Sequence, residues 1–579
     1  MNFLESIFHR LSQASDYPVV QEVRDGRIVP ATGADLLASI QRARSFLTKA
    51  GLRKGDRCAL LAPNSIRWIA LDLAILSEGG MVTPLYTRQS ALELVEMMKD
   101  CAPSLLCCGD ETLRGAIREC WPDAPSTFLL EEIFSEQSAD PCTTSYIPSG
   151  HSKVVPNVTS SISDAPQPLV DSDPVTIIYT SGTSGEPKGV ILGAGNIDFM
   201  LRRTTDRLDL LMGSTKRQER VFHYLPFCFC ASWIALLTCI SRHSLLTIST
   251  DLSKLSEEMK LAAPDYFLNV PALLERMRAG IEGQFKNWGG SRQLFFEKGG
   301  EAWLRRRSGT AALFDPFWLA VAHGLIYPAI KRKIAPNLKA LICGSAPLPL
   351  ETQLFFLMIG IPVLQVYGLT ETTGICTMDH PARARPGWVG SAIEGIEMKL
   401  GPGDEILVRG PNLFQGYWNR PQATCDALRG GWFHTGDQGE VDGAGNWLIT
   451  GRIKNLIVLS SGHNVAPEPI EEMLLRKIPG AQQVLVVGND RSFLSAVVTG
   501  DVNRAEVEQR LADINPQLPH YRRVRAFYLH KEPFSVDNGL LTTNGKLKRN
   551  IIAERLREQI DELYRHEAQI GQRDAKPQR

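Results

Sequence analysis

The chain has 579 residues, of which 44% are hydrophobic and 22% are charged, so it is long enough for at least two globular domains. Its 63 Lys and Arg residues equal its 63 Asp and Glu residues, and this balance excludes a global field that would attract nucleic acid or an anionic membrane. We therefore expect a globular protein with no nucleic-acid partner.

The N-terminal residues 1–13 predict a short amphipathic helix. They contain acids and an early polar break where a secretory signal needs a basic end and a long apolar core. The most apolar long window, residues 231–247, contains Arg242 and His243 and is too short for a transmembrane segment. The twelve cysteines include no paired C-x-x-C motifs, which favours reduced, mostly buried thiols over zinc ligands. The sequence predicts a soluble, cytoplasmic protein and leaves peripheral contact with a membrane open.

Helical and strand patterns alternate from Tyr17 to Leu105, as they do in doubly wound α/β units. The apolar run of residues 58–64 predicts a buried strand, and residues 65–80 predict an amphipathic helix that ends at glycine. Between Ser135 and Pro174 the composition shifts to Ser, Pro, Thr and Asp, which predicts a loop or linker.

The next segment, TSGTSGEPKG at residues 180–189, follows a β-branched apolar run and is suited to an anion with many oxygens. Glycines allow close approach of the backbone to phosphate, hydroxyls donate, and the lysine adds a mobile charge. It lacks the spacing of a Walker A loop, and a flexible surface loop is the alternative for such a composition. The predicted phosphate-binding set is Thr180, Ser181, Gly182, Thr183, Ser184, Gly185 and Lys188.

Residues 221–237 predict a buried strand followed by the start of a helix. Farther on, residues 303–309 and 314–334 form a basic and aromatic region. Amphipathic helices with basic rims can bind membranes, but helices packed under a surface loop have the same sequence pattern. We favour the second interpretation.

Two later segments are suited to a nucleotide. Residues 341–349 predict a strand that ends in a turn of small residues, as a slot for planar adenine needs. Residues 365–374 offer an aromatic face that would stack on a base or line an acyl pocket, a threonine for phosphate, and Glu371 as a hard oxygen ligand for Mg²⁺. The predicted residues besides Glu371 are Gly344, Ser345, Ala346, Pro347, Tyr367, Gly368 and Thr370.

The segment WFHTGDQGEVD at residues 432–442 places Asp437 on a turn flanked by glycine, after a strand. One carboxylate accepts hydrogen bonds from both hydroxyls of a ribose, although an acid in a turn is usually a turn residue only. Beyond residue 472, apolar runs alternate with helical patterns, which predicts a small α+β domain.

These motifs, in this order and rough spacing, resemble the AMP-forming acyl-activating superfamily, which includes acyl-CoA synthetases, adenylation domains of peptide synthetases and luciferases. The decamer at residues 180–189 matches nearly letter for letter, and DNGLLTTNGKLKR at residues 537–549 is most similar to long-chain fatty acyl-CoA synthetases. The resemblance covers about Leu37 to Arg549.

The resemblance implies an α/β fold in two domains. A large N-terminal adenylate-forming domain, residues 1–453, would contain doubly wound sheets and a small β-barrel subdomain. A small mobile α+β domain, residues 454–579, would follow a hinge at Lys454. The polar tail after about residue 567 is expected to be disordered.

The resemblance also assigns roles. Arg452 corresponds to the arginine that contacts ribose and α-phosphate, Gly462 to the segment that lines the pantetheine channel, and Lys546 to the catalytic lysine. Phe229 replaces the usual histidine at the acyl site, and Trp233 matches an aromatic gate to an acyl tunnel. For both aromatic residues, ordinary core packing is the alternative interpretation.

The implied reaction is the ATP-dependent ligation of a carboxylic acid to coenzyme A, with Lys546, Glu371 and Thr180 as catalytic residues and Glu371 as a ligand of Mg²⁺. The acid implied is a medium- to long-chain fatty acid. One alternative is a ligase that stops at acyl-AMP or loads an acyl carrier protein. Another is a pseudoenzyme that binds an acyl chain or a nucleotide, and Phe229 is the feature in its favour.

Overall fold

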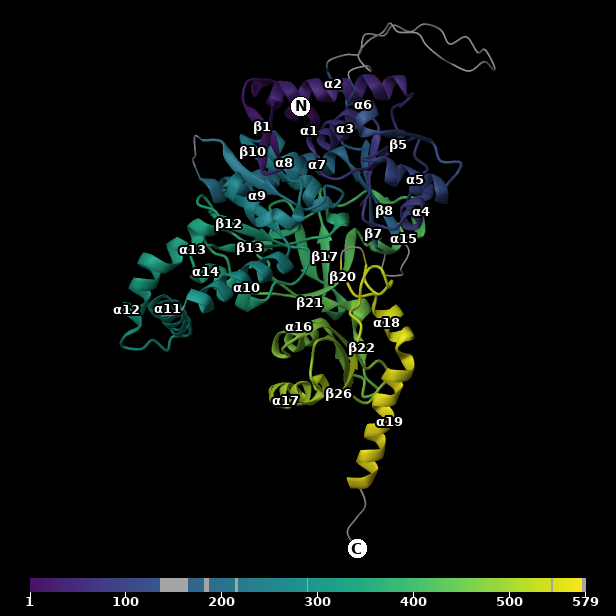
Figure 1. Cartoon of the computed structure of the whole chain (residues 1–579). Helices are drawn as coiled ribbons and strands as arrows, with labels where there is room; N and C mark the ends of the chain where they lie inside the picture. The colour runs from purple at the N-terminus through teal and green to yellow at the C-terminus, as the bar shows by residue number, and fades with distance from the viewer. Residues whose placement is uncertain (136–164, 182–186, 214–216, 289, 543–544, 575–579) are drawn as a thin grey trace. The chain divides into compact units, whose positions relative to one another are not determined.

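The computed structural model of the protein describes residues 1–135, 165–181, 187–213, 217–288, 290–542 and 545–574 (Figure 1). They form two compact units. The first comprises residues 1–398, 408–433 and 442–447, and the second comprises residues 399–407, 434–441 and those from 448 onward. The predicted α/β class, with a large N-terminal and a small C-terminal part, is confirmed. The second unit includes short segments that precede Lys454, and the domain boundary at Lys454 stays a prediction.

Two large sheets organise the first unit. One has the strand order β15-β14-β13-β12-β11-β9-β10-β1-β2, and its inner strands from β1 to β13 are parallel. The other has the order β18-β8-β7-β4-β3-β5-β6, in which β4, β3, β5, β6 and β7 are parallel. Crossing connections between parallel strands are typical of doubly wound folds, as predicted from residues 17–105.

The strands of the first sheet are β1 (Pro18–Arg24), β2 (Arg27–Thr32), β9 (Glu219–His223), β10 (Ser244–Ser249), β11 (Tyr266–Asn269), β12 (Ala340–Cys343), β13 (Val363–Tyr367), β14 (Thr377–Met378) and β15 (Ser391–Ala392). The strands of the second sheet are β3 (Arg57–Leu61), β4 (Met81–Pro84), β5 (Leu105–Cys108), β6 (Ser126–Leu129), β7 (Pro174–Ser181), β8 (Pro187–Gly193) and β18 (Gly416–Tyr417).

The helices of this unit are α1 (Phe3–Gln13), α2 (Gly33–Lys49), α3 (Ile66–Ser77), α4 (Ala91–Cys101), α5 (Glu111–Cys120), α6 (Leu130–Ile133), α7 (Ala194–Met212), α8 (Cys230–Ser241), α9 (Leu255–Ala262), α10 (Pro271–Trp288), α11 (Gly290–Ser308), α12 (Asp315–Val321), α13 (Tyr327–Ile334), α14 (Leu350–Met358) and α15 (Pro421–Ala427). The predicted N-terminal helix is confirmed as α1. Most of the predicted linker between Ser135 and Pro174 lies outside the described residues.

Helix α3 is buried on all sides, whereas its sequence predicted an amphipathic helix. It begins where the Ser65 hydroxyl accepts a hydrogen bond from the Trp68 amide at 3.0 Å. Every residue from Trp68 to Ser77 is buried because the helix packs against α1, α2, β1 and β4. Asp72 is therefore a carboxyl group in an apolar interior.

The indole of Trp233 in α8 donates a hydrogen bond to Asp72 Oδ2 at 3.0 Å, and Oδ1 has no hydrogen-bond partner among the described residues. Burial raises the pKa of Asp72 to about 7, and the bond from Trp233 only partly offsets this effect. The folded protein consequently holds the Asp72 proton more tightly than the unfolded chain does.

We expect the stability that this proton supplies to be present below about pH 4 and lost as the pH rises to about 7. Asp72→Asn mimics the protonated acid but does not titrate. In this window the unfolding free energy of the variant should therefore fall less steeply with pH than that of the unaltered protein, by at most about 1.4 kcal/mol per pH unit. Denaturant unfolding at pH 5, 6 and 7 measures it. Asp123→Asn, at an exposed position, is the control, and an equal slope in both variants would contradict the prediction.

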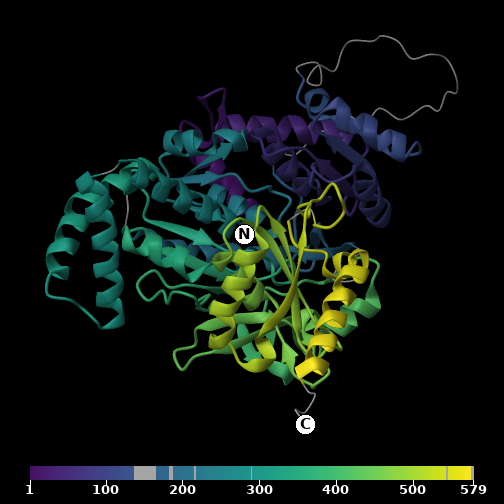
Figure 2. The same ribbon diagram turned by 60° about the horizontal axis from the view of Figure 1, so that its bottom comes forward.

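The second unit contains a three-stranded sheet, drawn in yellow-green in Figure 2, with helices packed beside it. Its strands are β24 (Ala481–Val487), β25 (Leu494–Gly500) and β26 (Val524–His530), and its helices are α16 (Glu468–Lys477), α17 (Arg504–Ile514), α18 (Arg549–Arg555) and α19 (Arg557–Asp574). The predicted α+β character of this part is confirmed.

Helix α19 continues to Asp574, beyond residue 567, where a disordered tail was expected to begin. Ile560 is buried against this unit and Tyr564 donates a hydrogen bond to the Val487 carbonyl at 3.2 Å, so the helix is anchored at its start. Neither α19 nor any other helix in the described parts of the chain has the length and apolarity that a bilayer-spanning segment needs. The disorder expected after about residue 567 stays a prediction. Residues 575–579 lie outside the described part of the chain.

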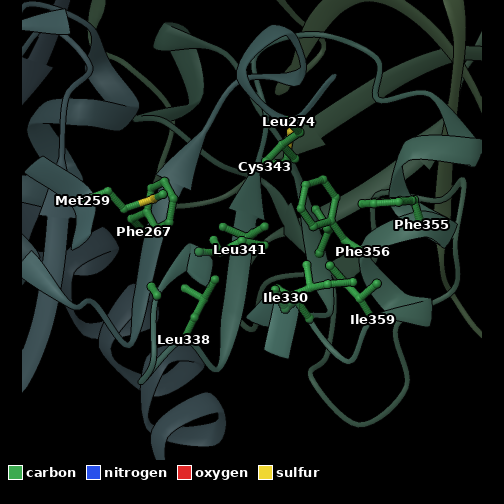
Figure 3. Packing of buried hydrophobic residues seen from close by; sticks show 14 of the residues in the cluster. Met259, Phe267, Leu274, Ile330, Leu338, Leu341, Cys343, Phe355, Phe356 and Ile359 are labelled. Atoms are coloured by element: carbon green, nitrogen blue, oxygen red, sulfur yellow. The ribbon is translucent and has the colours of Figure 1, made fainter. Parts of the chain in front are cut away.

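An apolar cluster joins strands of the first sheet to helices that flank it (Figure 3). Phe267 of β11 and Leu341 of β12 pack with Ile330 of α13 and Phe356 of α14, and all four are buried. This cluster holds β11 and β12 rigidly, so the loops that follow these strands begin at defined positions.

Candidate active site

Two of the predicted motifs meet at one edge of the first sheet. Strands β11, β12 and β13 are adjacent and parallel, so their carboxyl ends at Asn269, Cys343 and Tyr367 lie at the same edge. The turn of residues 344–347 follows β12, and residues 368–370 follow β13. Ligands of open parallel sheets bind outside the carboxyl ends of the strands, so this edge is the place where a nucleotide site is expected.

The turn after β12 requires small residues. The Gly344 amide donates a hydrogen bond to the Asn269 carbonyl at 3.2 Å, and a Cβ at Gly344 would lie 2.6 Å from Val366 Cγ2. Ser345 adopts a φ of 72°, in the left-handed region. Ser345, Ala346 and Pro347 are exposed, which leaves their edge accessible to a planar ligand.

The predicted phosphate loop lies at the tip of a hairpin. Thr180 of β7 pairs with Lys188 of β8, and Ser181 pairs with Pro187. The Thr180 hydroxyl donates to the Lys188 carbonyl at 3.5 Å. Gly182, Thr183, Ser184 and Gly185 lie outside the described residues, so their role as phosphate ligands stays a prediction.

Tyr417 connects this hairpin to Glu371. The Lys188 ammonium lies 5.0 Å from the centroid of the Tyr417 ring, and the Tyr417 hydroxyl donates to Glu371 Oε1 at 2.8 Å. Burial and then the charge of Glu371 raise the pKa of Tyr417, so its hydroxyl remains a donor. The sequence did not identify Tyr417 as a site residue. An aromatic residue after glycine is equally compatible with core packing, and nothing in the local sequence shows that it connects two motifs.

Glu371 lies in surroundings that would allow it to serve as one protein ligand of a magnesium ion. It lies in the half-buried 3₁₀ turn Thr370–Thr372, and among the described residues no group of three or more His, Cys, Asp or Glu side chains is placed to hold a metal. Mg²⁺ in nucleotide sites is commonly bound by one or two carboxylates together with phosphate oxygens and water. Glu371 therefore suits an ion that arrives with phosphates.

In the second unit, Asp437 and Arg452 form an ion pair. Asp437 lies on β20 (Trp432–Val441) and Arg452 ends β21 (Trp447–Arg452), which pairs with β20. Arg452 Nε is 2.8 Å from Asp437 Oδ1. The Asp437 amide donates to the Thr435 hydroxyl at 3.0 Å, after Gly436 with a φ of 70°. The turn thus fixes a carboxylate of which only 3% is exposed.

Lys546 is influenced by the same pair. Its amide donates to the Thr542 hydroxyl at 3.1 Å, its carbonyl accepts from the Thr542 amide at 2.7 Å, and the preceding Gly545 has a φ of 75°. Much of the side chain is exposed, yet partial desolvation and then the charge of Arg452 lower the pKa of Lys546, while Asp437 acts in the opposite direction. Three residues predicted from separate motifs are thereby brought within one electrostatic environment.

The two remaining predicted residues of this unit are exposed. Lys454 lies in the 3₁₀ turn Ile453–Asn455, directly after β21. Gly462 turns the hairpin of β22 (Ile457–Val458) and β23 (Asn464–Val465) with a φ of 80°, and no described atom lies within 4 Å of the place that a Cβ would take. The roles of Lys454 as hinge and of Gly462 in a channel stay predictions.

The structure distinguishes the two predicted aromatic residues of the acyl pocket. Trp233 is fully buried and its indole donates a hydrogen bond to Asp72, as in ordinary core packing, and its role as a gate to an acyl tunnel stays a prediction. Phe229 caps the N-terminus of α8, is half-buried, and has its ring 5.5 Å from that of Tyr86. Burial and then the charge of Glu371 raise the pKa of the adjacent Cys230, so Phe229 is next to a residue that senses Glu371.

Comparison with known proteins agrees with the motif order. A long-chain-fatty-acid–CoA ligase of Mycobacterium bovis is 27% identical over 98% of this chain and 97% of its own length. A chloroplastic long-chain-fatty-acid–[acyl-carrier-protein] ligase of Arabidopsis thaliana is 26% identical over 89% of this chain and 80% of its own length.

Two solved structures share the fold. The O-succinylbenzoate coenzyme A synthetase of Bacillus subtilis in complex with AMP superimposes with a TM-score of 0.71 at 20% identity, over 94% of this chain and 97% of that one. A fatty acyl CoA synthetase of Mycobacterium tuberculosis does so with a TM-score of 0.61 at 22% identity, over 96% and 98%.

The family models extend across both parts of the chain. The model described as AMP-binding enzyme matches residues 8–418, and the model described as AMP-binding enzyme C-terminal domain matches residues 454–568. The resemblance to the AMP-forming acyl-activating superfamily is thereby confirmed, and this chain belongs to the AMP-binding enzyme family.

Proposed function

We propose that the protein is an AMP-forming acyl-CoA synthetase that activates a medium- to long-chain fatty acid with ATP and transfers it to coenzyme A. The observation that carries the proposal is the Asp437–Arg452 ion pair, with Nε 2.8 Å from Oδ1, together with the lowered pKa of Lys546, which partial burial and then the charge of Arg452 cause. The ligase names of the relatives from Mycobacterium bovis and Arabidopsis thaliana support the acyl substrate class.

The chemistry requires two steps, because a carboxylate does not react directly with a thiol at neutral pH. First, a carboxylate oxygen attacks the α-phosphorus of ATP, the bond to the β-phosphate oxygen breaks, and pyrophosphate leaves. Second, the thiol of coenzyme A, having lost its proton, attacks the acyl carbon, and the bond to AMP breaks. Both steps depend on positioning and on stabilisation of charge.

In the first unit, Lys188 and Thr180 would contact the terminal phosphates of ATP, and Glu371, oriented by Tyr417, would hold Mg²⁺. A bound Mg²⁺ supplies neutralisation of phosphate charge. The tyrosine restricts Glu371 to one orientation before any ligand arrives.

In the second unit, Asp437 would accept hydrogen bonds from the ribose hydroxyls and Arg452 would contact ribose and α-phosphate. Lys546 would stabilise the charge shared by the carboxylate and the α-phosphate. Partial burial and then the charge of Arg452 lower its pKa, and an anionic ligand would favour the charged form again.

The acceptor of the acyl group has one specific rival. The Arabidopsis relative is named for an acyl carrier protein, and both acceptors present the same phosphopantetheine thiol. A pseudoenzyme that only binds an acyl chain or a nucleotide is a second candidate, supported by Phe229 in place of the histidine expected there.

A pyrophosphate-release assay tests the proposal. Purified protein is given ATP, Mg²⁺ and a panel of fatty, aryl and amino acids, with and without coenzyme A. We expect turnover that requires coenzyme A and is greatest with one fatty-acid length. Release that is slow and indifferent to coenzyme A would favour a carrier-protein acceptor, and no release with any acid would leave the pseudoenzyme.

Replacement of Gly462 tests the thioester step separately. Gly462→Val adds a side chain at a position with a φ of 80°, so it should slow transfer from acyl-AMP to coenzyme A about tenfold or more while adenylate formation changes little. The control is Gly539→Val, because Gly539 has a φ of 75° and equally open surroundings in the described structure. Equal effects of both substitutions would assign the loss to backbone strain alone.

A further inference from the structure

Lys546 belongs to a short hairpin-like segment of the second unit. Leu541 and Leu547 pair in an isolated antiparallel bridge, and the Lys548 amide donates a hydrogen bond to the Leu540 carbonyl at 2.9 Å. Leu540 is buried in an apolar cluster of this unit, against which both paired leucines pack. The position of Lys546 therefore depends on how the two ends of this segment are held.

The segment is followed directly by Arg549, whose guanidinium lies between two carboxylates of α16. Arg549 Nη1 donates to Glu471 Oε1 at 2.7 Å, and Nη2 donates to Glu471 Oε2. The same Nη2 is 3.8 Å from Glu468 Oε1. The two acids are three positions apart and share one face of the helix. Paired hydrogen bonds of this kind fix both the distance and the orientation of an arginine.

Other segments hold the same two acids. The Val486 amide of β24 donates to Glu471 Oε1 at 2.7 Å, and Asn455 Nδ2 donates to Glu468 Oε1 at 2.5 Å. Asn455 ends the 3₁₀ turn that follows Arg452. The pair of acids thus joins α16 and β24 to the turn beside Arg452 and, through the arginine of α18, to the hairpin.

Stability alone does not account for this cluster. The exposed fraction of the side chain is 10% for Glu471, 26% for Glu468 and 19% for Arg549, so all three charges have lost much of their hydration. This loss cancels most of the attraction within such a pair, and apolar side chains of similar size often stabilise a fold equally well. What the doubly bonded pair adds is a defined geometry. Three residues span at most about 11 Å of extended chain, so a displacement of Arg549 is passed on to Lys546.

We propose that Glu471 is a positioning residue for Lys546. Its paired hydrogen bonds anchor Arg549 and, with it, the hairpin. The Lys546 ammonium is thereby kept within the influence of Arg452 and Asp437. This inference rests on the proposed function, in which the ammonium offsets the charge of the carboxylate and the α-phosphate. Glu471 acts only through Arg549, so loss of the anchor should impair adenylate formation and spare the transfer to coenzyme A.

Trace labelling of amines with acetic anhydride tests the position of Lys546 without any substrate. The full chain is labelled between about pH 7 and pH 11, and fragment mass spectra of the peptide that contains Lys546 give the midpoint of its reactivity. In Glu471→Gln this midpoint should rise by about 0.5 pH unit or more, because the released lysine gains water and moves away from Arg452. Removal of an acid without movement would have the opposite sign, since it leaves the surroundings of the lysine more positive.

The matched control is Glu472→Gln, at the next position of α16, where the acid pairs with Arg476 on the same helix. It removes the same charge without touching the bonds to Arg549. The midpoint for Lys546 in this variant should equal that of the unaltered protein.

The two half-reactions supply a second readout. Glu471→Gln should lower kcat for pyrophosphate release about tenfold, leave KM for ATP within about twofold, and leave acyl-CoA formation from supplied acyl-AMP nearly unchanged. In a Lys546→Ala background the same substitution should cause no further loss, because residues that act through one group are not additive. Glu472→Gln should match the unaltered protein in each assay.

A charge-neutral double variant separates positioning from loss of folding. Glu471→Gln alone leaves the Arg549 guanidinium without its doubly bonded partner, and an uncompensated charge of this kind destabilises a fold. Glu471→Gln with Arg549→Gln removes both charges, so its thermal unfolding midpoint should stay near that of the unaltered protein. Labelling of Lys546 and adenylate formation should change as they do in the single variant.

Failure of this proposal is distinguishable from failure of the proposed function. If the unaltered protein releases no pyrophosphate with any acid, the proposed function fails, and the labelling midpoint still decides whether Glu471 positions Lys546. An unchanged or lowered midpoint in the folded double variant would overturn the proposal. A further loss of about tenfold in the Lys546→Ala background would overturn it as well, because the effect would then not pass through the lysine.

Discussion

Lys546→Ala should reduce adenylate formation about 10²- to 10³-fold while thioester formation from supplied acyl-AMP stays within a few-fold of the unaltered protein. The reason is that the first step brings an anionic carboxylate against the negatively charged α-phosphate, a repulsion that the Lys546 cation would offset, whereas the second step attacks an acyl group that is already activated. Pyrophosphate release measures the first step, and acyl-CoA formation from synthetic acyl-AMP measures the second.

Lys548→Ala is the matched control, because it removes the same charge two positions away. It should leave both steps nearly unchanged. Equal loss of both steps in Lys546→Ala would contradict the assigned role, and so would equal effects of the two alanine variants.

The pH dependence offers an independent readout on Lys546. Desolvation and Arg452 lower its pKa, so the cation is lost at a lower pH than for an ordinary lysine, and adenylate formation should decline on the alkaline side accordingly. Arginine stays charged over this range. Any activity that remains in Lys546→Arg should therefore lack that alkaline decline.

The second large effect is expected at Asp437. Asp437→Asn removes a charged acceptor that is 3% exposed and held by the Thr435 turn, so kcat/KM for ATP should fall about 10- to 100-fold, equivalent to roughly 1.5–3 kcal/mol for a hydrogen bond to a charged group. The turn itself should survive, because its hydrogen bonds involve the backbone of Asp437 and the hydroxyl of Thr435.

Nucleotide analogues identify the contact. The unaltered protein should discriminate against 2′-deoxy-ATP and 3′-deoxy-ATP, and Asp437→Asn should lose most of this discrimination, since the acceptor for both hydroxyls is weakened. Asp404→Asn, at an exposed acid of the same unit, should behave as the unaltered protein. If Asp437→Asn discriminates as strongly as before, Asp437 serves only as the partner of Arg452.

Several features of this protein follow from the sequence alone. The order of the motifs from Thr180 to Lys546 indicated the family. Glycines, hydroxyl residues and acids near strand ends form short motifs that can be recognised from neighbouring residues alone. Apolar runs such as residues 58–64 predicted the parallel strands, since a strand covered on both faces needs no polar alternation.

Other features depend on contacts between distant segments, which no local pattern contains. The hydroxyl of Tyr417 meets Glu371 only because β18 pairs with β8. The lowered pKa of Lys546 arises from partial burial and then from the charge of Arg452, which is far from it in sequence. Trp233 was predicted as a pocket residue or as core, and the hydrogen bond to Asp72 is what places it in the interior.

The helices α3 and α12 show the physical limit most clearly. Both are rich in apolar residues. The sequence of α3 predicted an amphipathic helix, and that of the region around α12 left two interpretations open. Tertiary structure covers α3 from Trp68 to Ser77 and leaves Phe314 and Phe317 at α12 exposed. Sequence determines how much apolar surface a helix has, but the free energy of burying that surface depends on which other segments reach it, and only the folded chain decides that.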